Sequence, residues 1–296
     1  MSATTLPASG RKTGKESASA LSVAFVVTRT EGDVFERNFA ISPTIQDARV
    51  KQVLVQKGFQ SATLAYNDAI QRCSEDLIVF SHQDVYFPES WLDDLQRSIA
   101  LLNQSDPNWA VLGCWGVTEK NWGTGYLHSV GHGTLGEPFD QPQRINTLDE
   151  CVIILRKSSG LQFDPGLPDF HFYGTDICLA ARKKGFTCYV ISAFCIHNTR
   201  MLRTLPPEYF NGYYHIKKRW AEYMPIYTAC ANVTRFDRDV LEFRFKRLVR
   251  RILGRDTTPR PRLDDPRKAL STEPQAAARQ TALHLPGVDP AHGAKE

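Results

Sequence analysis

Short apolar segments that alternate with helical segments are the feature of this chain that most restricts its fold. Leu77–Phe80 is fully apolar, which is typical of a parallel-sheet strand buried on both faces. After Pro88, apolar residues recur at helical spacing from Leu92 to Leu102. Such alternation predicts an α/β fold with a doubly wound, mainly parallel sheet and flanking helices.

Further segments fit the same alternation. We expect strands at Leu21–Thr28, Val53–Gln56, Ala110–Gly113, Cys151–Arg156 and Phe186–Ser192, and helices at Ser61–Cys73 and Asp176–Lys184. In sheets of this kind the ligand binds beyond the carboxyl ends of the strands. The polar residues that follow strand ends, Thr28–Thr30, His82–Asp84 and His197–Asn198, are therefore expected to meet in one crevice.

Composition restricts the class of protein. A chain of 296 residues with 42% hydrophobic residues can form one α/β catalytic domain with a substantial core. The net charge of +4 is small for this length, so we expect no nucleic-acid binding. The seven cysteines form no CxxC pair, which predicts reduced thiols in a cytoplasmic protein. No apolar run approaches the roughly 20 residues that a membrane span needs.

The two ends of the chain differ from its middle. Residues 1–19 lack a periodic apolar pattern, and residues 257–296 are rich in Pro, Ala, Arg and Asp, so we expect a disordered leader and a disordered tail. The catalytic domain is expected over residues 20–232. A basic amphipathic helix is expected over residues 233–256.

That basic segment has two interpretations. Within residues 241–253, Leu241, Phe245, Leu248 and Ile252 follow helical spacing among many arginines. One interpretation is a helix at the anionic inner face of a membrane, where lipid-linked acceptors are found. The other is a helix packed on the catalytic domain with a solvated basic face.

Asp84 is the first candidate for metal chemistry. It lies in a turn that directly follows the buried strand Leu77–Phe80, so its side chain is expected at the edge of the sheet. A carboxylate there can hold a divalent cation, which in turn binds phosphate oxygens. The alternative is that Asp84 serves only the turn, because aspartate is common in turns for local reasons.

A polar and aromatic loop over residues 163–176 carries the second candidate. It ends in Asp176, which we expect at the start of a helix, either as a general base facing the crevice or as an N-cap. The same loop contains His171 and Tyr173 and is expected to form the wall on the acceptor side. His197, just past a strand, is a third candidate whose role depends on its neighbours.

The order of these segments resembles the GT-A-fold glycosyltransferases of the family 2 type. More narrowly, it resembles the branch that contains the streptomycin-biosynthesis glycosyltransferase-like domain. The matching stretches, over roughly residues 20–230, are Ala65–Ile70, Val79–Pro88, Leu148–Glu150, Phe163–Leu179 and Ile196–Asn198. The resemblance implies a GT-A fold and transfer of a hexose from a nucleotide-diphosphate donor to an acceptor hydroxyl, with inversion as the default.

The resemblance also implies a metal site and a base. In the family, the last Asp of a DxD-like motif holds the metal; Asp84 keeps this position, while His82 replaces the first Asp. A downstream His, matched by His197, completes the binding of Mn²⁺ or Mg²⁺. Asp176 keeps the position of the family's catalytic base, although Thr175 replaces its acidic neighbour.

Contacts to the two substrates follow from the same resemblance. The donor nucleotide is expected to contact Thr28, Asn67, His82 and Gln83. The acceptor or the sugar is expected to contact Asp149, Glu150, His171 and Tyr173. The alternative for Asp149 and Glu150 is that they are ordinary acids at the edge of the strand Cys151–Arg156. The acceptor itself is a glycan, a lipid-linked molecule or a small molecule.

Two other classes of protein remain open at this point. His82, Asp84 and His197 also satisfy the two-His-one-carboxylate pattern of iron(II) oxygenases, in which Arg203 would hold a 2-oxoacid. That class has a β-barrel, and the helices expected between the strands count against it. A non-catalytic binding protein of glycosyltransferase-like fold would follow if His82 and Thr175 mark a lost site.

Overall fold

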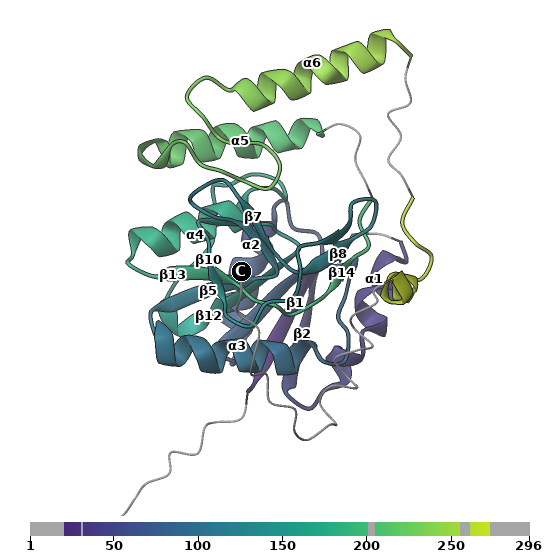
Figure 1. The fold of residues 1–296 in the computed structure, drawn as a ribbon, viewed down its shortest axis with the longest axis vertical. Coiled ribbons are helices and arrows are strands. Elements are labelled where there is room, and N and C mark those ends of the chain that lie inside the picture. The colour runs from purple at the N-terminus through teal and green to yellow at the C-terminus, as the bar shows by residue number, and fades with distance from the viewer. Residues whose placement is uncertain (1–20, 31, 201–204, 255–260, 273–296) are drawn as a thin grey trace, which may run out of the picture.

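The computed structural model describes residues 21–30, 32–200, 205–254 and 261–272 (Figure 1). The expected leader at residues 1–19, and Arg203, lie outside these residues.

A seven-stranded sheet forms the centre of the fold, with the strand order β10-β13-β5-β12-β3-β1-β2. All but β10 and β12 run in the same direction, and these two are antiparallel to their neighbours. The predicted mainly parallel α/β sheet is therefore confirmed. Its strands are β1 (Val23–Thr28), β2 (Val50–Gln56), β3 (Leu77–His82), β5 (Trp109–Gly113), β10 (Gln143–Arg144), β12 (Val152–Arg156) and β13 (Thr187–Val190).

Helices cover both faces of this sheet and extend beyond one end of it (Figure 1). The α-helices are α1 (Val34–Arg37), α2 (Ala62–Arg72), α3 (Trp91–Ser105), α4 (Tyr173–Lys183), α5 (Pro207–Arg219) and α6 (Arg238–Ile252). Short 3-10 helices are η1 (Phe39–Ile41), η2 (Pro43–Gln46), η3 (Lys157–Ser159), η4 (Ala221–Tyr223) and η5 (Pro266–Thr272).

The central strands are apolar on both faces because each face contributes to a separate core. Ala24 and Val26 pack with buried residues of α2, α4 and α5. Phe25 and Val27 pack with the apolar face of α3. All of these strand residues are fully buried, which explains why β1 reads as a continuous apolar run.

Two small sheets lie beyond the carboxyl edge of the central sheet. One has the order β4-β14-β8-β9 and the other β11-β6-β7. Their strands are β4 (Val85–Tyr86), β6 (Trp115–Val117), β7 (Gly123–Gly125), β8 (Leu127–Ser129), β9 (Gly133–Leu135), β11 (Thr147–Leu148) and β14 (Ile196–His197). The pairing of β4 with β14 joins two segments far apart in the sequence.

Two helix starts differ from the prediction. Helix α3 begins at Trp91, so Pro88 precedes the helix, and its carbonyl accepts a hydrogen bond from the Trp91 N–H. Helix α4 begins at Tyr173, which places Asp176 inside the first turn and not at the start. The αL conformation of Phe172, with φ of 66°, turns the chain into α4 three residues earlier than the sequence pattern indicates.

The expected disordered tail is wrong for residues 261–272. This segment lies beside α1 in Figure 1 and ends in η5. Ala269 packs in a small apolar cluster with Tyr86 and Ile196. This segment thus contacts the residues that follow β3, at the carboxyl edge of the sheet.

All seven cysteines are free thiols, and all but Cys230 are buried. Among the described residues, no helix combines the length and the apolar character required to cross a bilayer.

Candidate metal and donor-binding site

Three neighbouring strands end side by side at the edge of the sheet. In the parallel register, Thr28 of β1 pairs with Gln56 of β2 and with His82 of β3. A cavity of about 890 Å³ opens directly beyond these three residues. Its position is the one that the topology of an open α/β sheet favours for a ligand.

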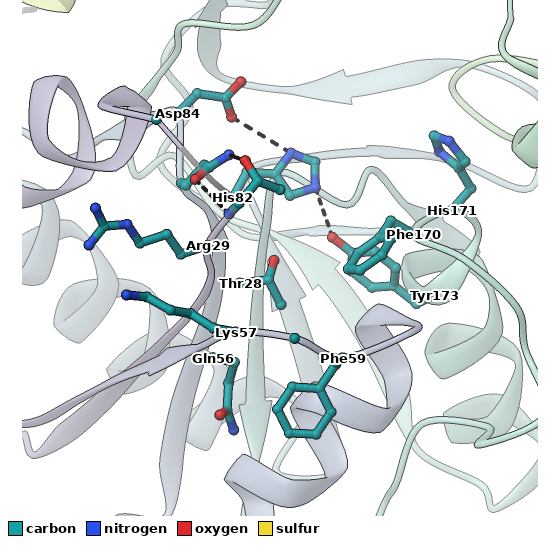
Figure 2. Close-up of a pocket in the computed structure, with 14 residues that line it drawn as sticks. Thr28, Arg29, Gln56, Lys57, Phe59, His82, Asp84, Phe170, His171 and Tyr173 are labelled. Atoms are coloured by element: carbon teal, nitrogen blue, oxygen red, sulfur yellow. Dashed lines mark hydrogen bonds and ion pairs between the residues drawn. The ribbon is translucent and has the colours of Figure 1, made fainter.

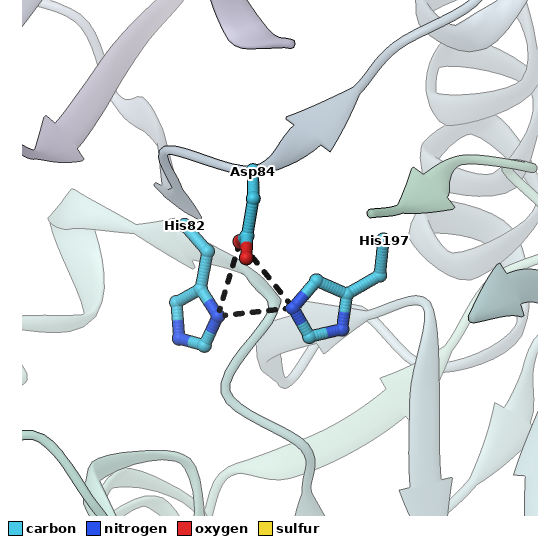
Figure 3. A group of neighbouring side chains, drawn as sticks. All are labelled: His82, Asp84 and His197. Carbon is cyan, nitrogen blue, oxygen red and sulfur yellow. Dashed lines mark hydrogen bonds and ion pairs between the residues drawn. The ribbon is translucent and has the colours of Figure 1, made fainter. Parts of the chain in front are cut away.

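His82, Asp84 and His197 form a compact cluster at this cavity (Figure 3). Nε2 of His197 lies 3.4 Å from Oδ1 of Asp84 and 3.3 Å from Nδ1 of His82. The antiparallel pairing of β14 with β4 places His197 opposite Val85, and the Asn198 N–H donates to the carbonyl of Asp84 at 2.8 Å. The cluster therefore follows from strand pairing as well as from side-chain contact.

The donor set of this cluster fits a divalent transition metal. Its two imidazole nitrogens and one carboxylate oxygen all lie within 4.8 Å of one another. Mg²⁺ prefers oxygen ligands, whereas imidazole together with carboxylate suits metals such as Mn²⁺, iron or zinc. Among the described residues, Asp149, Cys151 and His197 form a second group with the same spacing. Its thiol is fully buried, and burial raises the pKa of Cys151 well above its usual value.

The environment of His82 leaves one of its nitrogens available to a metal. Nε2 of His82 lies 2.8 Å from the hydroxyl of Tyr173, and this hydroxyl donates to the carbonyl of Glu150 at 3.0 Å. Since the hydroxyl proton is used there, the tautomer that satisfies both contacts carries its proton on Nε2. The lone pair of Nδ1 then faces Asp84 and His197.

The three side chains of the cluster differ in how their surroundings shift their pKa values. Burial, together with the charge of His197, lowers the pKa of His82 to about 4, so this imidazole is neutral at pH 7. Burial opposes ionisation of Asp84, but His197, His82 and Arg262 outweigh it and hold the pKa of this carboxyl well below its usual range. Burial likewise opposes the charge of His197, yet Asp84 raises the pKa of this imidazole.

Arg262 makes a contact with the site that sequence reasoning missed. Its guanidinium donates to Oδ2 of Asp84 through Nη2 at 2.8 Å and Nε at 3.2 Å. The backbone of Leu263 is held by the side chain of Asn198, which accepts from the Leu263 N–H and donates to its carbonyl, both at 2.8 Å. Asn198 is fully buried. No apolar periodicity marks this part of the chain, so only the fold reveals the contact.

The cavity has a basic side, of which sequence reasoning selected Arg29, within Thr28–Thr30, but missed Lys57 and Phe59. Arg29, Lys57 and Phe59 line it together with the predicted Thr28 (Figure 2). The predicted Gln83 also belongs to the lining. The sequence could have identified Lys57 and Phe59, because they follow the strand that ends at Gln56. The rule that selected the residues after β1 and β3 applies equally to the residues after β2. The cations Arg29 and Lys57 can bind the phosphates of a ligand.

Contacts between loops hold this side of the cavity in place. Gln83 accepts from the Thr30 N–H at 3.1 Å and donates to the Thr30 hydroxyl at 2.6 Å. The turn after β3 is thereby tied to the loop after β1. Phe170, His171 and Tyr173 also line the cavity (Figure 2).

The acidic pair Asp149 and Glu150, expected to contact the acceptor or the sugar, does not belong to the lining of this cavity and lines a separate small pocket with Thr175 and Tyr209. Oδ1 of Asp149 accepts from the Cys151 N–H at 2.9 Å, and a ligand oxygen of Asp149 lies within 4.8 Å of His197. Burial, followed by the charge of Asp149, raises the pKa of Glu150 to about 8. The backbone N–H groups of Phe172 and Gly174 face the Glu150 carboxylate and partly offset this effect.

The structure does not place Asp176 where a base facing the crevice was expected. Its side chain is fully buried and does not line the cavity. Oδ1 accepts from the indole N–H of Trp220 at 2.7 Å and pairs with Nε of Arg219 at 3.0 Å. Oδ2 accepts from the Asp164 N–H at 3.3 Å. Both oxygens are engaged within the protein, so Asp176 joins α4 to α5.

Asn67 is likewise removed from the donor site. Its amide donates to the carbonyl of Phe163 at 2.8 Å and accepts from the Phe163 N–H at 3.0 Å. Asn67 does not line the cavity. The structure does not bring Asn67 to the expected nucleotide site, because the side chain holds the loop that precedes α4 against α2.

Comparisons with known proteins give limited sequence information. No family model matches the chain. A protein of Fuscovulum blasticum named ATP synthase subunits region ORF 6 is 29% identical over 142 residues, which are 46% of this chain and 57% of that protein. The chain thus spans little more than half the length of this relative.

Solved structures give clearer information on the fold. GalNAc-T7, crystallised with UDP, GalNAc and Mn²⁺, superposes with a TM-score of 0.51 at 10% identity, over 70% of this chain and 49% of that one. TarS of S. aureus superposes with a TM-score of 0.43 at 12% identity, over 67% of this chain and 39% of that one. The chain has the GT-A fold of glycosyltransferases such as GalNAc-T7.

Proposed function

We propose that the protein is a metal-dependent glycosyltransferase that uses a nucleotide-sugar donor. The observation that carries this proposal is the cluster of His82, Asp84 and His197 at the carboxyl edge of the sheet. It opens on a cavity that Arg29 and Lys57 line from another side. A divalent cation and two basic side chains around one cavity provide charges suited to a diphosphate.

Each wall of the cavity has a role in this proposal. Thr28 and Gln83 contact the nucleoside, and Phe59 offers it an apolar surface. Arg29 and Lys57 bind the diphosphate. The metal, held by Asp84, His197 and Nδ1 of His82, is Mn²⁺ in preference to Mg²⁺, and when bound it neutralises the charge of the leaving diphosphate.

The sugar and the acceptor then lie toward α4. His171 and Tyr173 line this side of the cavity and are proposed to contact the sugar or the acceptor. Asp149 is half-buried beside the metal cluster, with Oδ1 bound to the Cys151 N–H. It is proposed to accept the proton of the acceptor hydroxyl, in place of the fully buried Asp176, whose two oxygens are both engaged. Attack on the anomeric carbon from the side opposite the diphosphate inverts its configuration, as expected for a hexosyltransferase with a single displacement.

The fold neighbour supports the donor class. GalNAc-T7 carries UDP, a sugar and Mn²⁺, which are the three components that this proposal assigns to the cavity. The free cysteines support a reducing compartment such as the cytoplasm. The acceptor is proposed to be a glycan, a lipid-linked molecule or a small molecule with a free hydroxyl.

Calorimetry and turnover assays test the proposal together. The purified protein is titrated with UDP-, GDP- and dTDP-sugars with and without Mn²⁺, and sugar release and transfer are measured for the same panel. We expect Mn²⁺-dependent binding of at least one donor and loss of this binding in Asp84→Ala and His197→Ala. Asp33→Asn, which changes an exposed carboxylate paired with Arg37 four residues along the chain, is the control and should bind as the wild type does.

The competing classes give different results in these assays. The iron(II) oxygenase interpretation is disfavoured because the cluster lies on an α/β sheet and not in a β-barrel. Iron-dependent consumption of a 2-oxoacid would nevertheless overturn the transferase proposal. Donor binding without hydrolysis or transfer to any acceptor would support a binding protein, and the absence of nucleotide binding with every metal would refute both.

A further inference from the structure

Helix α6 presents a row of apolar side chains to solvent. The exposed fractions are 57% for Leu241, 65% for Phe245, 54% for Leu248 and 73% for Ile252. These residues recur every three or four positions, so they form one stripe along the helix. An apolar stripe of this length costs free energy in water, which indicates a surface that is covered in the functional state.

The contacts of α6 with the protein leave this stripe open. Val240 is the buried residue of the helix, and Phe243 packs partly against the core. The guanidinium of Arg244 lies over the rings of Phe210 and Tyr214 of α5, at 4.9 and 5.7 Å from their centroids. Helix α6 therefore attaches to α5 by one side and lies outside it, as Figure 1 shows.

A basic groove runs between the two helices, next to the apolar stripe. It has a volume of about 420 Å³, and Arg244, Arg247 and Arg251 line it together with Tyr214. The three arginines lie one turn apart on α6, so their charges follow the axis of the helix. Leu248 belongs to both the groove and the stripe, which makes the two features one continuous surface.

We propose that α6 and the α5–α6 groove form a docking surface for an anionic lipid bilayer. The arginines of the groove bind lipid phosphates, and the stripe of Leu241, Phe245, Leu248 and Ile252 enters the boundary between head groups and acyl chains. Apolar residues beside a row of cations are the combination that an anionic interface binds. This surface involves none of the residues assigned to the donor site, so the inference does not depend on the proposed transfer reaction.

The charges favour a bilayer over a second copy of the chain. If two copies met through this surface, their arginine rows would approach each other without an acidic partner along the groove. Among the groove residues that the structure describes there is no carboxylate. An anionic lipid surface supplies the opposite charge along the whole row.

Vesicle flotation of the full chain tests the proposal. Neutral phosphatidylcholine vesicles are compared with vesicles that also contain phosphatidylglycerol, at low and high salt. We expect binding to the anionic vesicles only, weaker at high salt. We expect a loss of about tenfold or more in the partition coefficient for Arg244→Gln/Arg247→Gln/Arg251→Gln, since each arginine near the surface contributes severalfold.

The apolar stripe is tested in the same assay. Phe245→Ser/Ile252→Ser should lose binding to a similar degree without a change in unfolding midpoint, because both side chains are exposed. The controls are Trp122→Ser, which removes an aromatic ring that is 70% exposed elsewhere, and Arg97→Gln on α3. Both controls should partition as the wild type does.

Three results would overturn the proposal. One is the absence of anionic-vesicle binding by the wild type. Another is equal partition of the stripe and groove variants with the controls. The third is a dimer by light scattering that Phe245→Ser/Ile252→Ser dissociates, since the stripe would then bind a second copy.

Discussion

The guanidinium of Arg262 and the metal cluster use different oxygens of Asp84. Arg262 donates to Oδ2 at 2.8 Å, whereas Oδ1 lies 3.4 Å from His197. Arg262 therefore leaves Oδ1 available to a cation. Its positive charge nevertheless lies on the other oxygen of the same carboxylate, close to the position of that cation. Like charges at this distance repel, although the partly exposed position of Arg262 reduces the effect.

Removal of this charge is predicted to strengthen metal binding. Arg262→Gln should bind Mn²⁺ several times more tightly than the wild type in the absence of nucleotide, as measured by calorimetry. Arg267→Gln is the matched control, because Arg267 lies in the same segment but pairs with Asp265 at 2.8 Å. If Arg262→Gln binds Mn²⁺ more weakly, Arg262 serves to position Asp84 and its repulsion is minor.

The hydroxyl of Tyr173 is predicted to affect metal binding without touching the metal. Tyr173→Phe removes the group that accepts from Nε2–H of His82, so both tautomers of this imidazole become accessible. Loss of such an outer partner typically lowers metal affinity about tenfold or more. Equilibrium titration with Mn²⁺ measures the change, and Tyr189→Phe, which loses a hydroxyl bonded to Asp106 far from the site, is the control. Equal affinities of the two variants would contradict this role.

Strand-end residues were predictable from the sequence, whereas residues that depend on tertiary contacts were not. Asp84 and His82 follow a fully apolar strand, and the topology of α/β sheets places such residues at the ligand edge. Asp176 was misplaced because α4 begins three residues early, after Phe172 in the αL conformation. That conformation is rare for a residue other than glycine and leaves no mark in apolar periodicity.

Residues 261–272 also show that sequence patterns do not reveal tertiary contacts. The composition of residues 257–296 predicts disorder, yet Leu263 is held by two hydrogen bonds to the side chain of Asn198. These bonds join residues 65 positions apart. No local pattern records a pairing of this kind, so Arg262 was not assigned to the site.

Glu150 is predicted to make stability depend on pH. Its pKa in the folded protein is about 8, above the ordinary 4.5, so the folded state binds the proton more tightly than the unfolded state does. The contribution of Glu150 is therefore full below pH 4.5 and is lost as the pH rises through 8. Glu150→Gln, which stays neutral, should be more stable than the wild type at pH 9 by at least about 1.4 kcal/mol, which corresponds to one pKa unit.

Urea unfolding at pH 4.5 and pH 9 measures this difference. The variant and the wild type should have similar free energies of unfolding at the lower pH and should diverge at the higher one. Glu89→Gln, at an exposed position, is the control and should follow the wild type throughout. A constant difference between Glu150→Gln and the wild type at both pH values would show that the side chain acts through packing and not through its charge.

Asp176 is predicted to be a residue of stability and not of metal or donor binding. Asp176→Ala leaves the indole N–H of Trp220 and the guanidinium of Arg219 without their shared acceptor. The buried indole N–H that is left without an acceptor costs about 1–3 kcal/mol. Arg219 adds little to this cost, because its side chain is 39% exposed and keeps its ion pair with Asp164. Asp176→Asn should cost less, because its amide oxygen still accepts from Trp220.

Two measurements on the same variants separate stability from binding. In urea unfolding at pH 7, the free energy of unfolding should be highest for the wild type, lower for Asp176→Asn and lowest for Asp176→Ala. The Mn²⁺ and donor affinities of the folded variants should stay within about twofold of the wild type, because Asp176 does not line the cavity. Asp68→Asn is the control. Asp68 is 39% exposed and pairs with Arg72 four residues along α2, so its substitution is expected to cost less than about 1 kcal/mol of stability. If Asp176→Asn instead keeps its full stability and donor affinity but loses turnover, then Asp176 reaches the acceptor through a movement of α5, and the proton acceptor is Asp176 and not Asp149.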